Sequence, residues 1–371
     1  MEEENKNKAR PKIINYVGFN YDSSFFTVGT DIGFQILKTS SFDIILSRVL
    51  NGGIGLVKIL DNTNIFCLVG GGKYPRFSPN KLMIWNDHKN DITNEFRCQS
   101  FIINCYIKKN CVFIICSDMI TIINLKNMKI INNINTINNP TGISSISNNP
   151  KKYVFAFPEK CNISLIFLNE FEKGNNEELK KLKKLEVNIN IIKNAHKGSI
   201  NTLSLNYDGS KLASASERGT IVRVFDTKAK NLIFEFRRGN TDAYIYSLNF
   251  SFDDSLLGLT SDHGTCHIFS LKKTNQNEKK EKEKNKNSGY MSYISNNLSF
   301  GGVGKKISNA LSLGQELSWK KFDIPHKERS FISFLKNDNN NVYVIDKSGN
   351  YLSINLTKEQ EPKIIKKTKI I

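Results

Sequence analysis

The sequence predicts an all-β, seven-bladed β-propeller, because a hairpin unit recurs in it at the period of a propeller blade. Asp22, Asp208 and Asp253 each precede a glycine by 11 residues, and the second and third copies begin 45 residues apart. In each copy the aspartate opens a turn, an apolar strand follows, and the glycine marks a second turn before another strand. A weaker copy surrounds Gly349. Helical repeats of this length would need apolar residues at a 3.6-residue spacing, which is missing, so the period indicates blades.

The length of the chain fits one propeller with a single insertion and two tails. Seven blades take about 315 residues, and the chain has 371. The expected blades are 13–49, 50–90, 92–130, 131–185, 186–230, 231–325 and 326–358. We expect the strand near Ile13–Val17 to pair with the last blade and close the ring. Residues 272–318 interrupt the repeat in blade six, and we expect this long loop to face a membrane. The propeller is expected to span 12–358, between a disordered tail at 1–11 and a basic tail at 359–371.

The composition favours a cytosolic protein with an anionic partner. Fifty-three Lys and Arg residues against 35 Asp and Glu give a net charge of +18, which attracts anionic lipid, nucleic acid or acidic proteins. The seven cysteines form no CxxC pair, which indicates reduced thiols, and Cys105, Cys111 and Cys116 fall in apolar, core-like segments. No second pair of ligands matches His263, Cys266 and His267, so no metal site is predicted. With no signal peptide and no apolar run of 18 residues, membrane association is expected to be peripheral.

Two adjacent arginines are the first functional signal. Residues 236–239 read Phe-Arg-Arg-Gly, and we place them at the start of a strand that opens blade six. Successive strand side chains point to opposite faces, so Arg237 and Arg238 should diverge. Because guanidinium groups bind phosphate through paired hydrogen bonds, the functional interpretation is two anion sites that share one strand. The structural interpretation is a charged guard on an exposed edge strand.

Three further motifs give this pair a context. They are Leu68 to Asp87, Ala195 to Thr227 and Ser261 to Leu271. Together with the arginines, these motifs resemble the PROPPIN family, which are seven-bladed propellers that bind phosphoinositides. The resemblance covers residues 65–271. It implies a fold without the Trp-Asp pair of ordinary WD repeats, and neither Trp85 nor Trp319 is followed by Asp here.

The resemblance implies two sites on the propeller rim for phosphatidylinositol 3-phosphate and 3,5-bisphosphate, one on each side of the arginine strand. By position, the first site would use His196, Ser216, Thr220, Arg223 and Arg237. The second would use Arg238, Ser261, His263, Thr265 and His267.

These residue types suit a phosphate ligand. A phosphomonoester carries nearly two negative charges, which arginines can pair while hydroxyls donate to the remaining acceptors. Histidine adds charge only near or below its pKa of ~6.5, so binding is expected to tighten at mildly acidic pH. The structural alternative is that the Ser and Thr side chains serve hairpin turns and that the two strand histidines are satisfied core residues.

The insertion carries a candidate membrane anchor. From Val303 to Leu317 its apolar residues fall on one side of a helical wheel, which predicts an amphipathic helix of modest quality. The residues expected to enter the membrane are Leu298, Phe300, Val303, Ile307 and Leu311. The alternative is a loop that packs these residues on the side of the propeller. The family's corresponding loop assists membrane insertion, which favours the anchor.

The leading hypothesis is a non-enzymatic peripheral membrane scaffold that recruits autophagy-type partners. The resemblance implies a lipid-transfer partner at blade two, around Lys73 to Lys81, and attachment to autophagic, endosomal, vacuolar or plastid-related membranes. We expect a monomer that binds no nucleic acid and needs no cofactor. The alternative is a generic WD-like platform for acidic proteins or RNA. An enzyme is disfavoured because no catalytic constellation stands out, and Gly70-Gly71-Gly72 lacks the Lys-Ser/Thr of a phosphate-binding loop.

Overall fold

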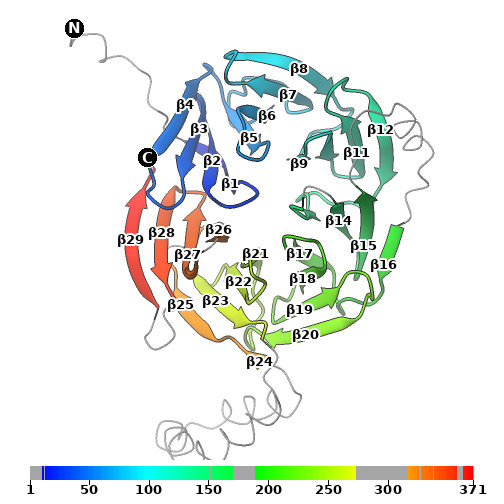
Figure 1. Cartoon of the computed structure of the whole chain (residues 1–371), viewed down its shortest axis with the longest axis vertical. Helices are drawn as coiled ribbons and strands as arrows, with labels where there is room; N and C mark the ends of the chain where they lie inside the picture. Colours follow the sequence, from blue (N-terminus) through cyan, green and yellow to red (C-terminus); the bar gives the residue numbers. More distant parts are fainter. Residues whose placement is uncertain are drawn as a thin grey trace, which may run out of the picture.

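The computed structural model of the chain is a ring of β-sheets around a central axis (Figure 1). It describes residues 11, 13–149, 152–169, 189–272, 316–325, 327–336, 338–356 and 362–370. The strands in these ranges form seven sheets, and strands that neighbour one another in the chain pair antiparallel within each sheet. The seven-bladed β-propeller that the repeat predicted is confirmed.

Blades one to three are each formed by four consecutive strands of the chain. Blade one contains β1 (Ile14–Phe19), β2 (Phe25–Thr30), β3 (Gly33–Lys38) and β4 (Ile44–Val49). Blade two contains β5 (Ile54–Ile59), β6 (Ile65–Gly70), β7 (Lys81–Asn86) and β8 (Asp91–Arg97). Blade three contains β9 (Asn104–Ile107), β10 (Cys111–Ile115), β11 (Met119–Asn124) and β12 (Ile130–Asn135).

Blades four to seven follow in chain order, and blade six contains the interruption. Blade four contains β13 (Ser145–Ile146), β14 (Lys152–Glu159), β15 (Asn162–Asn169) and β16 (Ile189–Ile192). Blade five contains β17 (Ile200–Leu205), β18 (Lys211–Ser216), β19 (Ile221–Asp226) and β20 (Leu232–Arg237), with β24 (Glu316–Leu317) added at its edge. Blade six contains β21 (Ile245–Phe250), β22 (Leu256–Ser261), β23 (Thr265–Ser270) and β25 (Lys320–Asp323). Blade seven contains β26 (Ser330–Leu335), β27 (Asp338–Asp346), β28 (Asn350–Asn355) and β29 (Lys363–Lys369).

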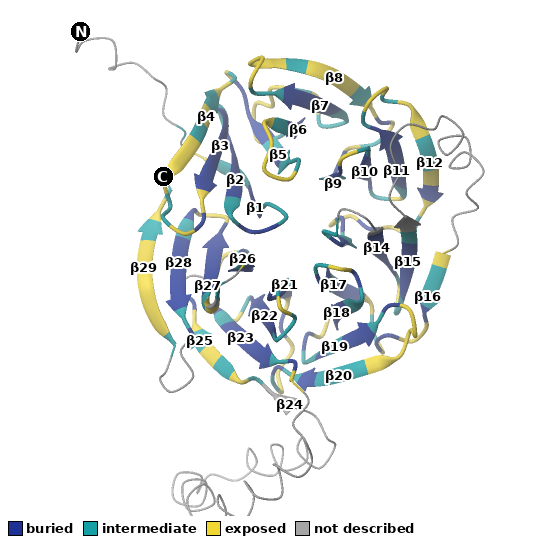
Figure 2. Ribbon diagram, in the orientation of Figure 1, coloured by how far each residue is buried: buried dark blue, intermediate teal, exposed yellow. Residues whose placement is uncertain are grey.

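The core lies between neighbouring blades, while the outermost strands form the solvent-exposed rim (Figure 2). Every residue of β10 is buried, whereas β8 and β29 are largely exposed. One apolar cluster joins blades two and three through Cys67, Cys105 and Val112. Another joins blades five and six through Phe236 and Phe269. Cys105, Cys111 and Cys116 are buried as expected, so the second and third strands of each blade supply most of the buried apolar surface.

The repeated aspartates build the inner hairpin turns. Asp22, Asp208 and Asp253 each accept a hydrogen bond from the backbone N–H two residues later, at 2.9 to 3.1 Å. Burial acts to raise the pKa of each carboxyl group, but hydrogen bonds from neighbouring serine and asparagine side chains and from the backbone together outweigh it, and each pKa is lowered. Such side-chain turns explain why the sequence repeats aspartate at this point.

The ring closes differently from the expectation. Residues 14–19 pair with β2 inside their own blade, and the edge of blade seven is completed by β29, which pairs with β28. Blades one and seven therefore meet through side chains: Val17 and Phe26 pack with Tyr351, and the Tyr351 hydroxyl donates to the Thr39 carbonyl oxygen. The expected exchange of an N-terminal strand into the last blade is wrong, because the C-terminal segment supplies that strand.

Several expected boundaries also shift. Strand β29 lies inside the segment expected to be a basic tail, so the propeller continues past residue 358. The fourth strands of blades two to five fall mostly in the next expected blade, although each pairs within the preceding one; they are β8, β12, β16 and β20. These rim strands are only partly buried, so the sequence offers no apolar run that would assign them to the preceding blade. The expected N-terminal tail lies almost wholly outside the described residues.

The interruption at 272–318 leaves blade six after β23 and returns through β25. Just before its return, β24 pairs parallel with the end of β20 in blade five, where Arg237 lies opposite Leu317. The insertion is therefore attached at the seam between blades five and six (Figure 1). Among the described residues, no helix is long and apolar enough to cross a bilayer.

Candidate functional site

The Phe-Arg-Arg-Gly segment lies at the end of β20, the outermost complete strand of blade five, and not at the start of blade six as expected. Arg237 is the last residue of β20 and Arg238 begins the link to β21. Arg237 lies opposite Ile221, and Phe236 lies opposite Val222, whose side chain is fully buried. Phe236 packs toward blade six, so the alternation of the strand turns Arg237 to the other face. Arg238 lies just beyond the strand, and the two guanidiniums have separate partners: Arg237 bonds Asn240, whereas Arg238 bonds the Gly219 and Thr241 carbonyl oxygens.

The first expected cluster lies on the face of blade five that carries Arg237. The Arg223 Nε donates to Glu235 Oε2 at 2.8 Å, and its Nη1 donates to the Ala195 carbonyl oxygen at 2.8 Å. This guanidinium holds the chain beside His196, whose Nε2 lies 2.9 Å from the Ser214 hydroxyl. Arg223 and His196 are therefore brought together on this face.

The other members of the first set lie around the adjoining turn. Ser216 ends β18, and its carbonyl oxygen accepts a hydrogen bond from Gly219 N. Thr220 precedes β19, and its carbonyl oxygen accepts a hydrogen bond from Arg238 N at 2.9 Å. Arg237 Nη1 donates to Asn240 Oδ1 at 3.2 Å. Ser216, Thr220 and Arg237 therefore lie around the turn between β18 and β19 and the end of β20.

The second expected cluster is a connected chain of hydrogen bonds on blade six. The Ser261 and Thr265 hydroxyls lie 3.2 Å apart, and the Thr265 hydroxyl lies 3.3 Å from His267 Nε2. The chain of hydrogen bonds continues on the other side of the imidazole, where His267 Nδ1 lies 3.4 Å from the Ser318 hydroxyl. Ser261 and His267 are buried. His263 lies in the exposed turn between β22 and β23.

Arg238 lies at the junction between blades five and six, near the second cluster. It is 8% exposed, its Nε donates to the Gly219 carbonyl oxygen at 2.8 Å, and its Nη2 donates to the Thr241 carbonyl oxygen. Its charge helps to lower the pKa of His267. Burial lowers the pKa of Arg238 itself, while Asp262 and Asp242 oppose that change. The guanidinium is thus held in place by backbone oxygens, with its charge near the cluster.

The two histidines, His196 in the link between β16 and β17 and His267 in β23, both have pKa values below the ordinary range. Burial, followed by the charge of Arg223, lowers the pKa of His196 to about 4. Burial, followed by the charges of Lys321 and Arg238, lowers the pKa of His267 to about 3. Each imidazole is therefore uncharged when a ligand arrives, and it contributes hydrogen bonds rather than a positive charge. The tightening expected at mild acidity requires the ligand itself to raise these pKa values.

These lowered pKa values predict a loss of stability at mild acidity. Unfolded histidines take up protons near pH ~6.5, whereas folded His196 and His267 do so only well below that. The free energy of unfolding should therefore fall as pH drops from about 7 to about 5. The aspartates with lowered pKa values lose their contribution only below about pH 4, outside this window.

Urea denaturation at several pH values measures this effect. Replacing His196 and His267 together with Asn should make the pH dependence shallower, whereas His88→Asn, in an exposed turn of blade two, should leave it unchanged. If the free energy of unfolding of the native protein did not change between about pH 7 and about pH 5, the lowered pKa values of the two histidines would be contradicted.

Three contributors were missed by the sequence analysis. Ser214 bonds His196, Glu235 pairs with Arg223, and Ser318 bonds His267. Ser214 and Glu235 could have been found from strand alternation, since Arg223 lies opposite both residues. Ser318 had no such signal, because the long interruption separates it from blade six in the sequence.

The expected partner loop at blade two is exposed and firmly shaped. Residues 71–80 connect β6 to β7, and Tyr74 is 73% exposed. The Tyr74 carbonyl oxygen accepts from Gly53 N at 2.7 Å, and Arg76 N donates to the Gly53 carbonyl oxygen at 2.9 Å. A Cβ on Gly70 would lie 1.7 Å from the Phe77 carbonyl oxygen, so glycine is required there. Lys73 and Arg76 stand over the Tyr74 and Phe77 rings, which gives the loop a cationic and aromatic surface.

Two other expectations concern the membrane anchor and a metal site. The residues expected to enter a membrane, Leu298, Phe300, Val303, Ile307 and Leu311, lie outside the described residues. Within the described ranges, no group of three His, Cys, Asp or Glu side chains is arranged to hold a metal ion.

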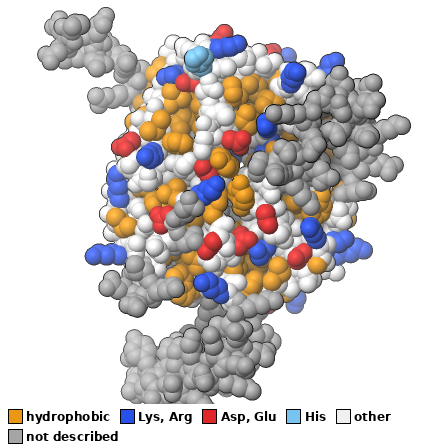
Figure 3. All heavy atoms as spheres, viewed as in Figure 1, with side chains coloured by type: hydrophobic (Ala, Val, Ile, Leu, Met, Phe, Trp, Pro, Cys, Tyr) orange, Lys and Arg blue, Asp and Glu red, His pale blue; other side chains and the backbone are white. Residues whose placement is uncertain are grey.

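Figure 3 shows that on one face of the ring, basic side chains lie mostly near the edge and acidic ones nearer the centre.

Comparison with known proteins agrees with the architecture. The chain is 34% identical over 266 residues to SVP1-like protein 2 of Pichia angusta, which covers 70% of each chain. It is 30% identical over 298 residues to autophagy-related protein 18 of Dictyostelium discoideum, which covers 80% of this chain and 76% of the relative.

Solved structures share the fold at lower identity. A structure of Kluyveromyces lactis Hsv2 with its complete 6CD loop matches 98% of this chain and 100% of its own, with a TM-score of 0.74 and 19% identity. A complex titled KlAtg21 with the coiled coil of AgAtg16 matches 97% and 100%, with a TM-score of 0.69 and 20% identity. The model of the PROPPIN family matches residues 13–301. With the blades, the diverging arginines and these relatives in agreement, the chain belongs to the PROPPIN family.

Proposed function

We propose that this protein is a non-enzymatic peripheral membrane scaffold that binds phosphatidylinositol 3-phosphate and phosphatidylinositol 3,5-bisphosphate at two sites on its rim. The observation that supports this most is the divergence of Arg237 and Arg238 toward two separate polar clusters. Arg223 and His196 lie on one face of blade five, and the Ser261–Thr265–His267 chain lies on blade six.

The chemistry of each cluster suits a phosphomonoester. Its oxygens need several donors, and a guanidinium supplies two in parallel at the strength of a charge-assisted hydrogen bond. Arg237 already makes a bond to the neutral Asn240 side chain, which a phosphate could replace with little loss. Arg238 is held by carbonyl oxygens, so its charge is positioned before a ligand arrives. Preorganised donors lose less entropy when they bind.

The insertion supplies a third point of attachment in this proposal. Strand β24 joins the insertion to the end of β20, and Ser318 joins it to His267. A segment anchored between the two clusters can reach the same membrane surface that they contact. Two headgroup sites and one inserted segment bind together through effective concentration, even where each contact is weak.

A protein partner is proposed on a different face. The exposed loop at Lys73 to Lys81 in blade two presents cationic and aromatic groups that suit a partner with an acidic, partly apolar segment. Relatives named for autophagy support a role in recruiting that machinery to autophagic, endosomal or vacuolar membranes. The solved complex of a similar propeller with a coiled coil also supports protein recruitment.

Liposome co-sedimentation tests the lipid proposal against non-specific attraction to polyanions. Vesicles with phosphatidylinositol 3-phosphate should retain the protein more strongly than vesicles with unphosphorylated lipid and enough phosphatidylserine to match the charge. Retention should persist with RNA as competitor and decline only moderately with salt, whereas a non-specific polyanion binder loses affinity steeply. Equal retention by both vesicles would refute the proposal.

A further inference from the structure

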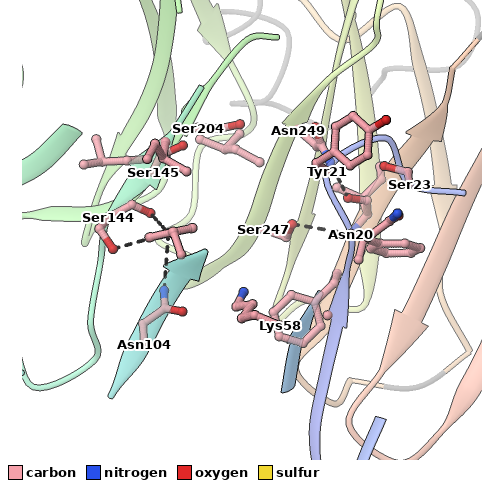
Figure 4. Close-up of a pocket in the computed structure, with 18 of the residues that line it drawn as sticks. Asn20, Tyr21, Ser23, Lys58, Asn104, Ser144, Ser145, Ser204, Ser247 and Asn249 are labelled. Carbon is pink, nitrogen blue, oxygen red and sulfur yellow. Dashed lines mark hydrogen bonds between the residues drawn. The ribbon is translucent and has the colours of Figure 1, made fainter. Parts of the chain in front are cut away.

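The central channel of the propeller holds a large polar cavity that the rim sites do not use. Its volume is about 540 Å³, within the range of small-molecule sites. The inner strands of several blades line it, and Figure 4 shows Lys58, Asn104, Ser145 and Asn249 among its walls. Hydroxyl and amide groups form most of the polar lining, so the cavity offers many donors and acceptors around its circumference.

The charge of this lining has one sign. Lys58, Arg329 and Lys347 line the cavity, and no Asp or Glu is among the described residues that do so. Asp262 and Glu328 act on the pKa of Tyr246 near this end of the ring, but neither lines the cavity. Three like charges that line one cavity repel one another, and an anion between them would relieve that repulsion.

Arg329 and Lys347 form a pair at one end of the channel, on blade seven. Lys347 N donates to the Arg329 carbonyl oxygen at 3.0 Å, which holds the two residues side by side. The Arg329 Nε is buried and has no hydrogen-bond partner among the described residues. A buried guanidinium donor without an acceptor is costly, and an anion in the channel would stabilise the charge of this guanidinium.

Lys58 approaches the same cavity from blade two. Its Nζ lies 5.5 Å from the centre of the Tyr16 ring and 5.4 Å from that of Tyr106. The rings stabilise the cation without neutralising it, so its charge remains available to a ligand. Tyr106 is itself fixed by donating its hydroxyl to the Ser144 carbonyl oxygen at 2.7 Å.

We propose that the central channel binds a small soluble polyanion, a phosphorylated polyol, between Lys58 on blade two and the Arg329–Lys347 pair on blade seven. The cations match the phosphate groups, and the serine, asparagine and tyrosine side chains match the hydroxyls of a polyol body. Lys347 is exposed, so a soluble ligand can enter at that end. The inner strands line the channel, whereas the rim arginines lie at the end of the outer strand β20, so the proposed ligand is a soluble molecule and not the membrane lipid of the rim sites.

Isothermal titration calorimetry with inositol hexakisphosphate tests this site in the full chain. The rim sites are first removed by Arg237→Thr with Arg238→Thr, and one binding event should remain in this background. Adding Arg329→Gln and Lys347→Gln should weaken it by about tenfold or more, since each lost charge-assisted bond has that order of effect. The matched control, Arg97→Gln with Lys89→Gln, removes the same charge from exposed positions of blade two and should leave affinity unchanged.

Two outcomes would overturn the channel site. One is no binding in the rim-deficient background, and the other is equal weakening by the control pair, which would mean attraction to net charge alone. Thermal unfolding checks that the variants fold, and Lys347→Gln alone, at an exposed turn, is the fallback if Arg329→Gln does not. The channel variant with intact rim arginines should still bind phosphoinositide liposomes, so failure of the lipid proposal and failure of the channel site give different results.

Discussion

Replacing Arg237 and Arg238 together with threonine is expected to abolish binding to liposomes that contain phosphatidylinositol 3-phosphate. Each guanidinium is the main fixed charge of its cluster, and a hydrogen bond to a charged group contributes about 1.5–3 kcal/mol. Losing one such site weakens its contact by about tenfold to a hundredfold. Losing both also removes the gain in effective concentration that links them.

The single variants make this prediction sharper. Arg237→Thr and Arg238→Thr should each leave measurable, weaker binding, and their combined loss should exceed the product of the separate losses if two sites act on one membrane. Co-sedimentation across a range of lipid fractions measures this. Arg97→Thr, on the rim strand of blade two, is the matched control and should bind like the native protein. Full binding by the double variant would exclude the arginines as the lipid contacts.

Phe236→Ala is expected to lower the free energy of unfolding by about 3–5 kcal/mol, the range for truncating a buried aromatic residue. Phe236 is fully buried, and its ring stacks on Phe269 with centroids 4.8 Å apart. It also stacks on Phe234 at 5.6 Å. This ring joins blades five and six directly beneath the two arginines, so its loss leaves a cavity at the seam.

Gly239→Ala, in the same segment, is the contrasting control. A Cβ at this position meets no atom within 4 Å, and the backbone there is not in a left-handed conformation. Its effect on stability should stay within about 0.5 kcal/mol, as for ordinary surface substitutions. Urea denaturation of both variants measures the difference. If both variants lost the same free energy of unfolding, packing of the Phe236 ring would not be the cause of the destabilisation.

The repeat could be predicted from sequence because its turns are chemically specific. Asp208 and Asp253 bind their own turns, so the same residue recurs at the same place in the blade. The rim strands carry no such marker. Strand β29 is rich in lysine and exposed along most of its length, so its sequence resembles a charged tail, and only pairing with β28 identifies it as a strand.

The candidate sites were predicted in part, for a similar reason. The divergence of Arg237 and Arg238 follows from strand alternation, which holds in either blade. Their assignment to blade five needed the pairing of β20 with β19. The bond from His267 to Ser318 depends on where the chain returns after a long interruption, and no local pattern encodes that return.

The join between the first and last blades has a consequence for synthesis of the chain. Among the strands that the structure describes, none crosses from one of these blades to the other, so backbone hydrogen bonds of a shared sheet do not hold them together. Val17 and Phe26 cannot be covered until Tyr351 has been synthesised, and the bonded pair Thr39 and Tyr351 is 312 residues apart in the sequence. Until then, the growing chain carries an apolar flank on blade one that invites association with other chains. Completion of the ring is therefore a late folding event, because it needs the first and the last blade together.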